Sequence, residues 1–507
     1  MIRSLLSAAL LVPAAVLGQP WSFADPISVA GPPDSGDYHH LDGAGRRHIA
    51  ASQDQVAVAW EDDRTGSPQI YLAVKPDRAD GFPAAQRLSD GEEAYEPALV
   101  AIDDGRWLAA WEQDGAIKAR LIDPSGPGPI SELAAKDSGQ VTLANDGTGR
   151  LAALWARRQA GGQLIQAAEL RANGRTVELA ETPVAVAPVA DHPYQAYPSA
   201  IWTPDGRLVV AWEDRRAGHT RLLFSSRTRG QDFAPPGQLN AFRQPTSEDG
   251  KPSQLGTGAM RVVLASAGKG LVHAVWLDKR NASSGYAVWG AASDDGGRSF
   301  GPNQIVQDQF GADVAQWHAA LTGGSNGFVA AWDDPREGWS DPDETGDVLI
   351  SWNQGGDWSA DLVVPGAFGD GYQGSPAVAL DPKGVLHLVW IERADLRSPT
   401  SLRYLRAEPV GDPTDWGKEA RLNSPHNGKI PNSRGCSGSE PDAGAVRRQD
   451  CNRGGSRHSP AAGLVTPPQS ARWHTTAHGG LKPERLRPEP SAQDRKPDAV
   501  VQRSQHG

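Results

Sequence analysis

Short runs of apolar residues alternate with turn residues along most of the chain, and one phrase returns at intervals. It consists of small apolar residues, a Trp, an acidic residue or pair and then often Arg and Gly, as in 58–66 and 210–218. The Trp spacing runs from 44 residues (Trp111 to Trp155) to 64 residues (Trp212 to Trp276), which is typical of one propeller blade with loop insertions. Clear copies centre on Trp60, Trp212, Trp276 and Trp332, and weaker copies on Trp111, Trp155 and Trp390.

The residues around each Trp predict four short antiparallel strands. A strand such as 197–201 precedes a Gly turn, the Trp strand follows, and a third strand such as 221–225 and a last short one such as 361–364 complete the unit. Apolar residues keep no helical spacing without a Gly or Pro, and a β-sandwich would not explain seven copies. The sequence therefore predicts an all-β propeller of four-stranded antiparallel blades. Seven blades are preferred and six are the fallback, with 27–29 and 419–422 pairing to close the ring.

Both ends of the chain differ from this body. Residues 1–18 carry one positive charge, an apolar run from Leu5 to Leu17 and a terminal Gly18, the pattern of a secretory signal peptide. Residues 429–507 are rich in Gly, Ser, Pro, Arg and Gln without strand alternation, so we expect a disordered, low-complexity tail. The propeller is expected over 19–428, and the protein is expected to be secreted or periplasmic.

Composition narrows the range of partners. The formal net charge is −11 and the tail is mildly basic, so the body is the more acidic part, which argues against nucleic acid. No segment after the leader is apolar enough to span a membrane. Cys436 and Cys451 both lie in the tail; a disulfide between them stays open, and the body is expected to fold without one. We expect a monomer whose partner is an extracellular glycan or an envelope protein.

Turns between the third and fourth strands share a second pattern. Residues 293–300, Ser-Asp-Asp-Gly-Gly-Arg-Ser-Phe, fit Ser-x-Asp-x-Gly-x-x-aromatic, and relaxed versions occupy 351–358 and 226–233. A carboxylate can accept hydrogen bonds from N–H groups of its own turn and Gly permits a positive φ, so the motif staples a hairpin. On these residues the body, over residues 20 to 425, resembles the sialidase-like superfamily of Asp-box (BNR-repeat) β-propellers, which includes sialidases and many non-enzymatic propellers.

The resemblance implies that the Asp boxes face the bottom of the propeller and the turns after the Trp strands face the top. Sialidases hold the substrate carboxylate with an arginine cluster and use a Tyr nucleophile. The corresponding binding candidates lie in top turns and in links between blades: Arg64, Arg216, Arg280, Arg336, Tyr38, Tyr197, Tyr372, Trp317 and Trp339. For the arginines the alternative is a structural ion pair with the Asp two positions earlier, because catalytic residues break a repeat rather than follow it. No catalytic residue is assigned.

An acid-rich loop follows Trp332. Asp341, Asp343 and Asp347 offer oxygen ligands that suit calcium in an exported protein. Their spacing matches no EF-hand, and a solvated acidic loop is the alternative. The histidines show no metal-ligand spacing. Calcium is therefore the one cofactor that the sequence raises.

Two functions stay open after these observations. The leading hypothesis is an exported propeller that recognises a glycan or another protein on its top face. The alternative is an exo-acting, retaining glycoside hydrolase of the sialidase type. Family sialidases have six blades and an Arg-Ile-Pro motif near the start, whereas this chain has seven Trp repeats and no such motif. A calcium-stabilised scaffold is a third possibility, and whether the protein is an enzyme is left undecided.

Overall fold

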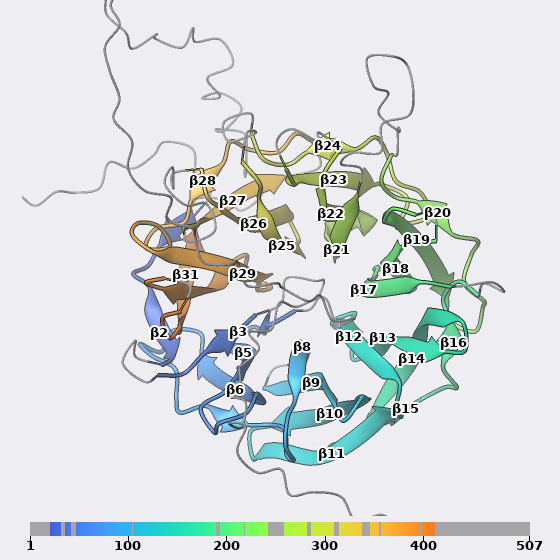
Figure 1. Cartoon of the computed structure of the whole chain (residues 1–507), viewed down its shortest axis with the longest axis horizontal. Helices are drawn as coiled ribbons and strands as arrows, with labels where there is room; N and C mark the ends of the chain where they lie inside the picture. Colours follow the sequence, from blue (N-terminus) through green and yellow to red (C-terminus); the bar gives the residue numbers. More distant parts are fainter. Residues whose placement is uncertain are drawn as a thin grey trace, which may run out of the picture. The chain divides into compact units, whose positions relative to one another are not determined.

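Seven antiparallel sheets are arranged around a central axis in the computed structural model (Figure 1), which describes residues 21–31, 36–41, 47–103, 105–188, 193–216, 218–241, 258–280, 285–308, 314–336, 345–353, 356–395 and 397–410. Each sheet is one blade, so the predicted β-propeller is confirmed with seven blades, and six is wrong. All of these residues belong to one unit, Met1–Lys429. The leader, the tail and the two cysteines lie outside the described residues.

The strands of a blade follow one another in chain order from the axis outward. In blades 1 to 7 the innermost strands are β4 (Ile49–Ala51, continued by β3, His39–His40), β8 (Tyr95–Asp103), β12 (Ser138–Asn145), β17 (Gln195–Trp202), β21 (Ala259–Ser266), β25 (Trp317–Gly324) and β29 (Tyr372–Leu380). The second strands are β5 (Gln55–Asp62), β9 (Arg106–Gln113), β13 (Leu151–Gln159), β18 (Arg207–Asp214), β22 (Val272–Asp278), β26 (Gly327–Asp334) and β30 (Leu386–Arg393). The third strands are β6 (Gln69–Pro76), β10 (Ala116–Asp123), β14 (Gly162–Asn173), β19 (Arg221–Thr228), β23 (Ala287–Ser293), β27 (Asp347–Asn353) and β31 (Ser401–Pro409).

The outer strands are short in most blades. In blades 1 to 6 they are β7 (Gln86–Arg87), β11 (Gly126–Ala134), β15 and β16 (Thr176–Leu179 and Val184–Ala185), β20 (Gly237–Gln238), β24 (Gln304–Ile305) and β28 (Leu362–Val363). The described residues also include a 3-10 turn, Gly268–Gly270. Within the same ranges no helix is long and apolar enough to cross a bilayer.

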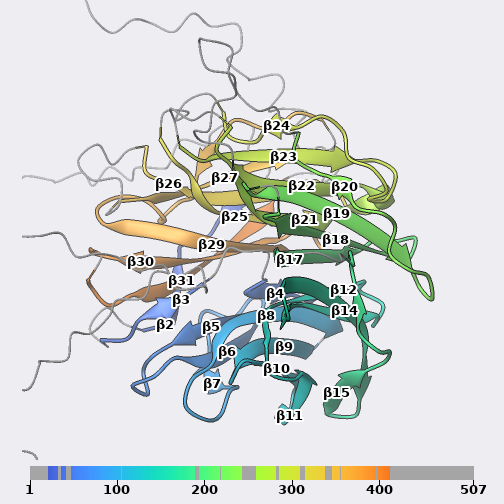
Figure 2. The same cartoon turned by 45° about the vertical axis from the view of Figure 1, so that its right-hand side comes forward.

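The N-terminal strands close the ring. Both β1 (Trp21–Phe23) and β2 (Ile27–Ala30) pair antiparallel with β31 of blade 7, and both views place β2 beside β31 (Figure 1, Figure 2). The sequence predicted the N-terminal partner of this closure correctly but paired it with 419–422, which lie outside the described residues. In blade 7, β1 and β2 take the place of the outer strand. The strand β31 is therefore the third strand of this blade, and its outer edge is paired with N-terminal residues.

The core is divided into layers between neighbouring blades, and each layer receives one Trp of the repeat. Trp60 packs in the layer between blades 7 and 1, and Trp276 in the layer between blades 4 and 5. The other five occupy the remaining layers in the same way. All seven indoles are fully buried or nearly so. Because both faces of a second strand are covered by other blades, β22 and β26 are buried along their whole length.

Turns after the second strands meet the links between blades on one face, which we call the top face. Ser67, after β5, donates a hydrogen bond to the carbonyl of Glu92 in the next link (2.6 Å). The N–H of Arg215, after β18, donates to the carbonyl of Tyr194 in the link before β17 (3.0 Å). Since adjacent strands run antiparallel, the turns between third and outer strands lie on the opposite, bottom face.

The turn that fits the Asp-box pattern is organised by Asp295 on the bottom face. Its carboxylate accepts hydrogen bonds from the Ser293 hydroxyl (2.8 Å) and from the N–H groups of Arg298 (2.9 Å) and Ser299 (3.0 Å). Burial alone would raise the pKa of Asp295, but hydrogen bonds from Ser299, Ser293 and Arg298 lower it to about 2. The turn is therefore held by a carboxylate that is ionised at neutral pH.

Aromatic residues after these turns pack against the preceding blade. The ring of Phe300 in blade 5 meets that of Phe224 in blade 4, with centroids 4.8 Å apart. The ring of Trp358 in blade 6 meets that of His273 in blade 5 at 5.0 Å. These contacts lie at the bottom edge of the inter-blade layers, so the turns join blades as well as strands.

A buried ion pair joins the first and last blades near the bottom face. Arg406 of β31 binds both oxygens of Asp77, which follows β6, at 2.6 and 2.7 Å. Asp77 is 5% exposed. Burial raises the pKa of Asp77, but the hydrogen bonds and charge of Arg406 and the nearby His387 and Lys75 outweigh it, so the pKa lies below its ordinary value.

We expect Asp77→Asn to lower the free energy of unfolding at pH 7 by about 3 kcal/mol, because it leaves Arg406 without its buried partner. The folded-state pKa of Asp77 is depressed, so the pair stabilises the fold above the unfolded pKa of 3.8 and loses its effect as the pH falls through the lower folded pKa. The difference between wild type and variant should therefore shrink below pH 4. Denaturant unfolding of the full chain at pH 7 and at pH 3 measures both values.

Arg78→Ala is the matched control, because Arg78 pairs with Glu408 across the same seam (3.5 Å) but is 82% exposed. It should change the free energy of unfolding by less than about 1 kcal/mol. Equal losses in the two variants would contradict a special role for the buried pair.

Candidate functional site

The four candidate arginines are each bound by the Asp two positions earlier. Arg216 pairs with Asp214 at 2.7 Å and Arg280 with Asp278 at 2.6 Å. Arg64 pairs with Asp62, and Arg336 with Asp334, in the same arrangement. The structure thus agrees with the alternative that the sequence offered for them, a turn-stabilising ion pair.

These arginines also lie along their own blades rather than gathering at the axis. The guanidinium of Arg64 lies 4.2 Å from the ring centroid of Tyr71 on β6, and that of Arg280 lies 3.8 Å from the centroid of Trp289 on β23. Arg336 reaches Asp361, which precedes the outer strand β28 (2.8 Å). Third and outer strands therefore hold these side chains, and the structure does not bring them together into an arginine cluster.

The three candidate tyrosines lie on separate blades. Tyr38 is at the seam of blades 7 and 1, 44% exposed, and its hydroxyl donates to the carbonyl of Arg397 (2.7 Å). Tyr197 of β17 is buried, and its ring lies 3.6 Å from the guanidinium of Arg261 on the neighbouring β21. Tyr372 begins β29, and its partners distinguish it from the other two.

Six innermost strands share a β-bulge close to the top face. In each, a residue other than Gly has a positive φ of 47–58°, namely Glu96, Gln140, Tyr197, Arg261, His318 and Ser375. Such a backbone costs about 1–3 kcal/mol unless its surroundings compensate. Blades 1, 2 and 4 provide a compensating acceptor, since there the Glu that follows the repeat Trp accepts from the bulge N–H of the next blade, whereas blades 3, 5 and 7 have an apolar residue at that position. Glu61 accepts from Glu96 (3.2 Å) and Glu213 from Arg261 (2.9 Å).

Blade 6 departs from this rule at Asp333, which follows Trp332 where blades 1, 2 and 4 have Glu. Its carboxylate binds the imidazole Nδ1 of His318 on β25 (2.9 Å) and accepts a hydrogen bond from the hydroxyl of Tyr372 in blade 7 (2.9 Å). Asp333 is buried, whereas 41% of the His318 side chain is exposed. We call these three residues the His–Asp–Tyr cluster.

Charge and burial fix the protonation of Tyr372. Burial, together with the charge of Asp333, raises the pKa of Tyr372 well above its ordinary value, so the hydroxyl keeps its proton and donates it. The guanidinium of Arg393 lies 4.5 Å from the ring centroid of Tyr372. Asp333 thus accepts from Tyr372 on one side and holds His318 on the other.

An aromatic pair lies beside the cluster. Trp317, the residue before His318, is 38% exposed, and its ring centroid lies 5.2 Å from that of Tyr286 in the turn before β23. The ammonium of Lys279 lies 5.7 Å from the centroid of Tyr286. Of the two Trp candidates outside the repeat, Trp317 is thus a top-face aromatic, and Trp339 lies outside the described residues. The pair and the cluster together form the candidate site.

Of the calcium candidates only Asp347 is described. It is buried at the start of β27 and accepts a hydrogen bond from the N–H of Gly369 (3.1 Å). Asp341 and Asp343 lie outside the described residues. Among the residues that are described, no group of three or more His, Cys, Asp or Glu is arranged to hold a metal ion.

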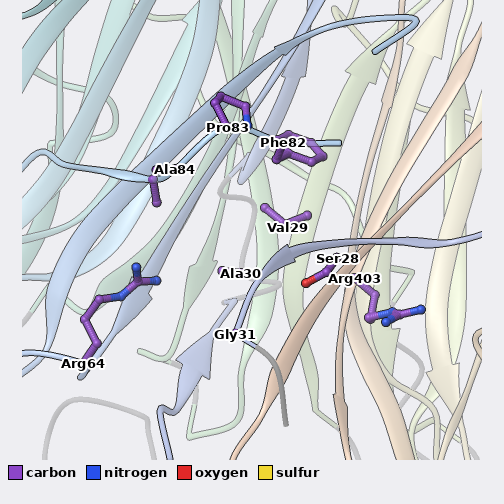
Figure 3. A pocket seen from close by; sticks show the side chains of 10 residues that line it. Ser28, Val29, Ala30, Gly31, Arg64, Phe82, Pro83, Ala84 and Arg403 are labelled. Carbon is purple, nitrogen blue, oxygen red and sulfur yellow. The ribbon is translucent and has the colours of Figure 1, made fainter. Parts of the chain in front are cut away.

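A groove of about 530 Å³ lies at the seam of blades 7 and 1, and Arg64 is part of its wall. In Figure 3, Arg64 and Arg403 lie on opposite sides, with Val29 and Phe82 between them. Arg64 is held there by Asp62. One predicted binding residue, Arg64, therefore lines this groove. The groove lies at the seam of blades 7 and 1 and is not part of the candidate site on blades 5 to 7.

Sequence reasoning named Trp317 and Tyr372 but missed the residues that connect them. Those residues, Asp333 and His318, are not among the candidates that the sequence predicts. A usable signal was present, because aligning the repeats on their Trp shows Asp in blade 6 where three other blades have Glu. Tyr286 and Arg393 carry no comparable signal.

Comparison with known proteins finds solved structures of low similarity to this chain. No protein-family model matches it, and no curated protein does. Solved structures that resemble it include the polysaccharide lyase Uly1 (8% identity, 77% of this chain and 100% of that one, TM-score 0.49). They also include an α-L-arabinofuranosidase of Fusarium graminearum (12%, 62% and 93%, 0.40) and the NanB sialidase of Streptococcus pneumoniae (11%, 73% and 70%, 0.36). Similarity this low leaves both the fold and the activity of this chain to be argued from its own residues.

We expect Arg280→Ala to lower the free energy of unfolding by about 1–3 kcal/mol, since it removes the charged partner of the buried Asp278. Denaturant unfolding of the full chain measures the loss. Arg171→Ala is the control, because Arg171 pairs with Glu178 (3.6 Å) where both side chains are exposed, and it should change little. An unchanged free energy of unfolding in Arg280→Ala would contradict the structural role of Arg280 and favour a role in ligand binding.

Proposed function

We propose that this propeller recognises a glycan on its top face, at the site formed by blades 5 to 7. The observation that carries the proposal is the exposed Trp317, packed against the part-buried Tyr286, beside the His–Asp–Tyr cluster. Aromatic faces and a few fixed polar groups are what a sugar ring requires, because its C–H faces are apolar and its rim carries hydroxyls. The cluster breaks the repeat at the place where the aromatic pair is exposed.

Recognition fits this site better than the alternative, a sialidase-type hydrolase. That chemistry needs arginines directed at a substrate carboxylate, and the four repeat arginines are each bound by their own Asp. It also needs a Tyr nucleophile, and Tyr372 is held as a part-buried neutral phenol that donates to Asp333. The contact between a Tyr and a carboxylate is the one feature that favours the alternative.

The site of action is proposed to be outside the cytoplasm. The support comes from the sequence, in which residues 1–18 have the pattern of an export signal. We also propose, from the sequence, that the chain belongs to the sialidase-like superfamily. On the same evidence we propose that it binds calcium and that it is a monomer.

We expect Trp317→Ala to weaken glycan binding about tenfold or more, as truncation of an aromatic anchor costs about 2 kcal/mol. The measurement is a glycan microarray with labelled full chain to find a ligand, followed by calorimetric titration of that ligand into both proteins.

Tyr38→Ala serves as the control, because Tyr38 is similarly exposed but lies at the seam of blades 7 and 1. It should leave the affinity unchanged. Equal losses in the two variants, or a folded wild-type chain that binds no glycan on the array, would contradict the proposal.

A further inference from the structure

The groove at the seam of blades 7 and 1 lies between β2, at the outer edge of blade 7, and the segment that leads into β7, at the outer edge of blade 1. Its volume of about 530 Å³ is in the range of small-molecule sites. The charged residues among its described lining are two arginines, Arg64 and Arg403, which face each other across Val29 and Phe82 (Figure 3). The groove thus combines two cationic sides with an apolar middle.

Two other blades show how an arginine at the position of Arg64 is completed. In blade 6, Arg336 binds Asp334, two positions earlier, at 2.6 Å. It also binds Asp361, the residue before the outer strand β28, at 2.8 Å. In blade 5, Arg280 likewise binds the side-chain oxygen of Asn303, the residue before the outer strand β24, at 3.0 Å. In these blades one guanidinium therefore holds two acceptors, one from its own turn and one from the outer edge of the blade.

Blade 1 has an alanine where the second acceptor stands. The pairing of third and outer strands aligns Ala85, the residue before β7, with Asp361 of blade 6. A methyl group accepts no hydrogen bond, and Ala85 and Arg64 both line the groove. The Arg64 side chain is 30% exposed, whereas that of Arg336 is 7% exposed. The place that an acidic side chain fills in blade 6 is therefore part of the groove in blade 1.

The opposite side of the groove also offers a cation. Arg403 of β31 lies 3.5 Å from Glu392, which is longer than a charge-assisted hydrogen bond, and its side chain is 32% exposed. Between the two arginines, the ring of Phe82 is fixed by an edge contact with that of Tyr404, with centroids 5.1 Å apart. A ligand that fits this arrangement has an anionic group at each end and an apolar chain between them.

We propose that the groove binds a small aliphatic dicarboxylate. One carboxylate lies against Arg64, in the place that the Asp361 side chain takes beside Arg336 in blade 6. The methylene chain lies over Phe82, and the second carboxylate meets Arg403. This site is separate from the proposed glycan site, which is on the top face of blades 5 to 7.

The probes are the straight-chain diacids from succinate to suberate, with hexanoate as an aliphatic monocarboxylate. Each is titrated by calorimetry into the full chain. We expect the best diacid to bind at one site per chain and at least about tenfold more tightly than hexanoate, because only a diacid engages both arginines.

Ala85→Asp is the decisive variant, because it gives blade 1 the acidic residue that blade 6 has. The new carboxylate should bind Arg64 and lower the affinity for the diacid at least about tenfold. The midpoint of thermal unfolding should not fall, which separates a filled site from a damaged fold. Pro236→Asp is the matched control, since Pro236 has the aligned position in blade 4, and it should leave the affinity unchanged.

A second variant tests the other end of the groove. Arg403→Ala should reduce the affinity for the diacid to that for hexanoate. The inference would be overturned by a folded wild-type chain that binds no diacid, by hexanoate binding as tightly as the diacids, or by unchanged affinity in Ala85→Asp. Loss of diacid binding in Trp317→Ala would also overturn it, because the ligand would then lie at the top-face site.

Discussion

One buried indole at each interface between blades is the packing on which the rest of the structure depends. A hydrogen-bond acceptor for the N–H of such an indole is stabilising, since an unpaired buried donor is costly. Asp62 and Asp278 each accept this hydrogen bond at 2.9 Å from the Trp two residues earlier. Each of these carboxylates then needs a cation, which the Arg two residues further on provides. In blades 1, 5 and 6 the Trp-x-Asp-x-Arg phrase is therefore one physical unit, whereas the buried Trp itself recurs in all seven blades.

This unit explains why the fold could be predicted from the sequence. Each part of the phrase is local, so a single copy already indicates a strand followed by a tight turn, and the seven repeat Trp residues indicate seven blades. Ring closure was only half predictable, because the pairing of Ile27–Ala30 with β31 joins residues more than 370 positions apart. The arginines could be given two interpretations, and the geometry of Arg64 and Arg280 along their own blades decided between them.

The candidate site was less accessible to sequence reasoning, for a physical reason. Asp333 meets His318 across a strand pair and Tyr372 across a blade interface, so its partners are 15 and 39 residues away. The backbone conformation that presents His318 is a bulge with φ of 47°, which no residue pattern encodes. Departure from the repeat is what marks the site, since residues that build the ring recur and residues that act on a ligand need not.

Asp333 and Asp334 are neighbours in β26. Comparing them tests most directly whether residues that follow the repeat build the ring and residues that depart from it form the candidate site. Asp334 binds the Trp332 indole (3.3 Å) and Arg336 (2.6 Å), as the repeat requires, whereas Asp333 serves the cluster. The measurement is the free energy of unfolding of Asp334→Asn and Asp333→Asn by denaturant titration of the full chain. The account predicts a loss of about 1–3 kcal/mol for Asp334→Asn and a clearly smaller change for Asp333→Asn. The opposite order would contradict it, because Asp333 would then be part of the framework.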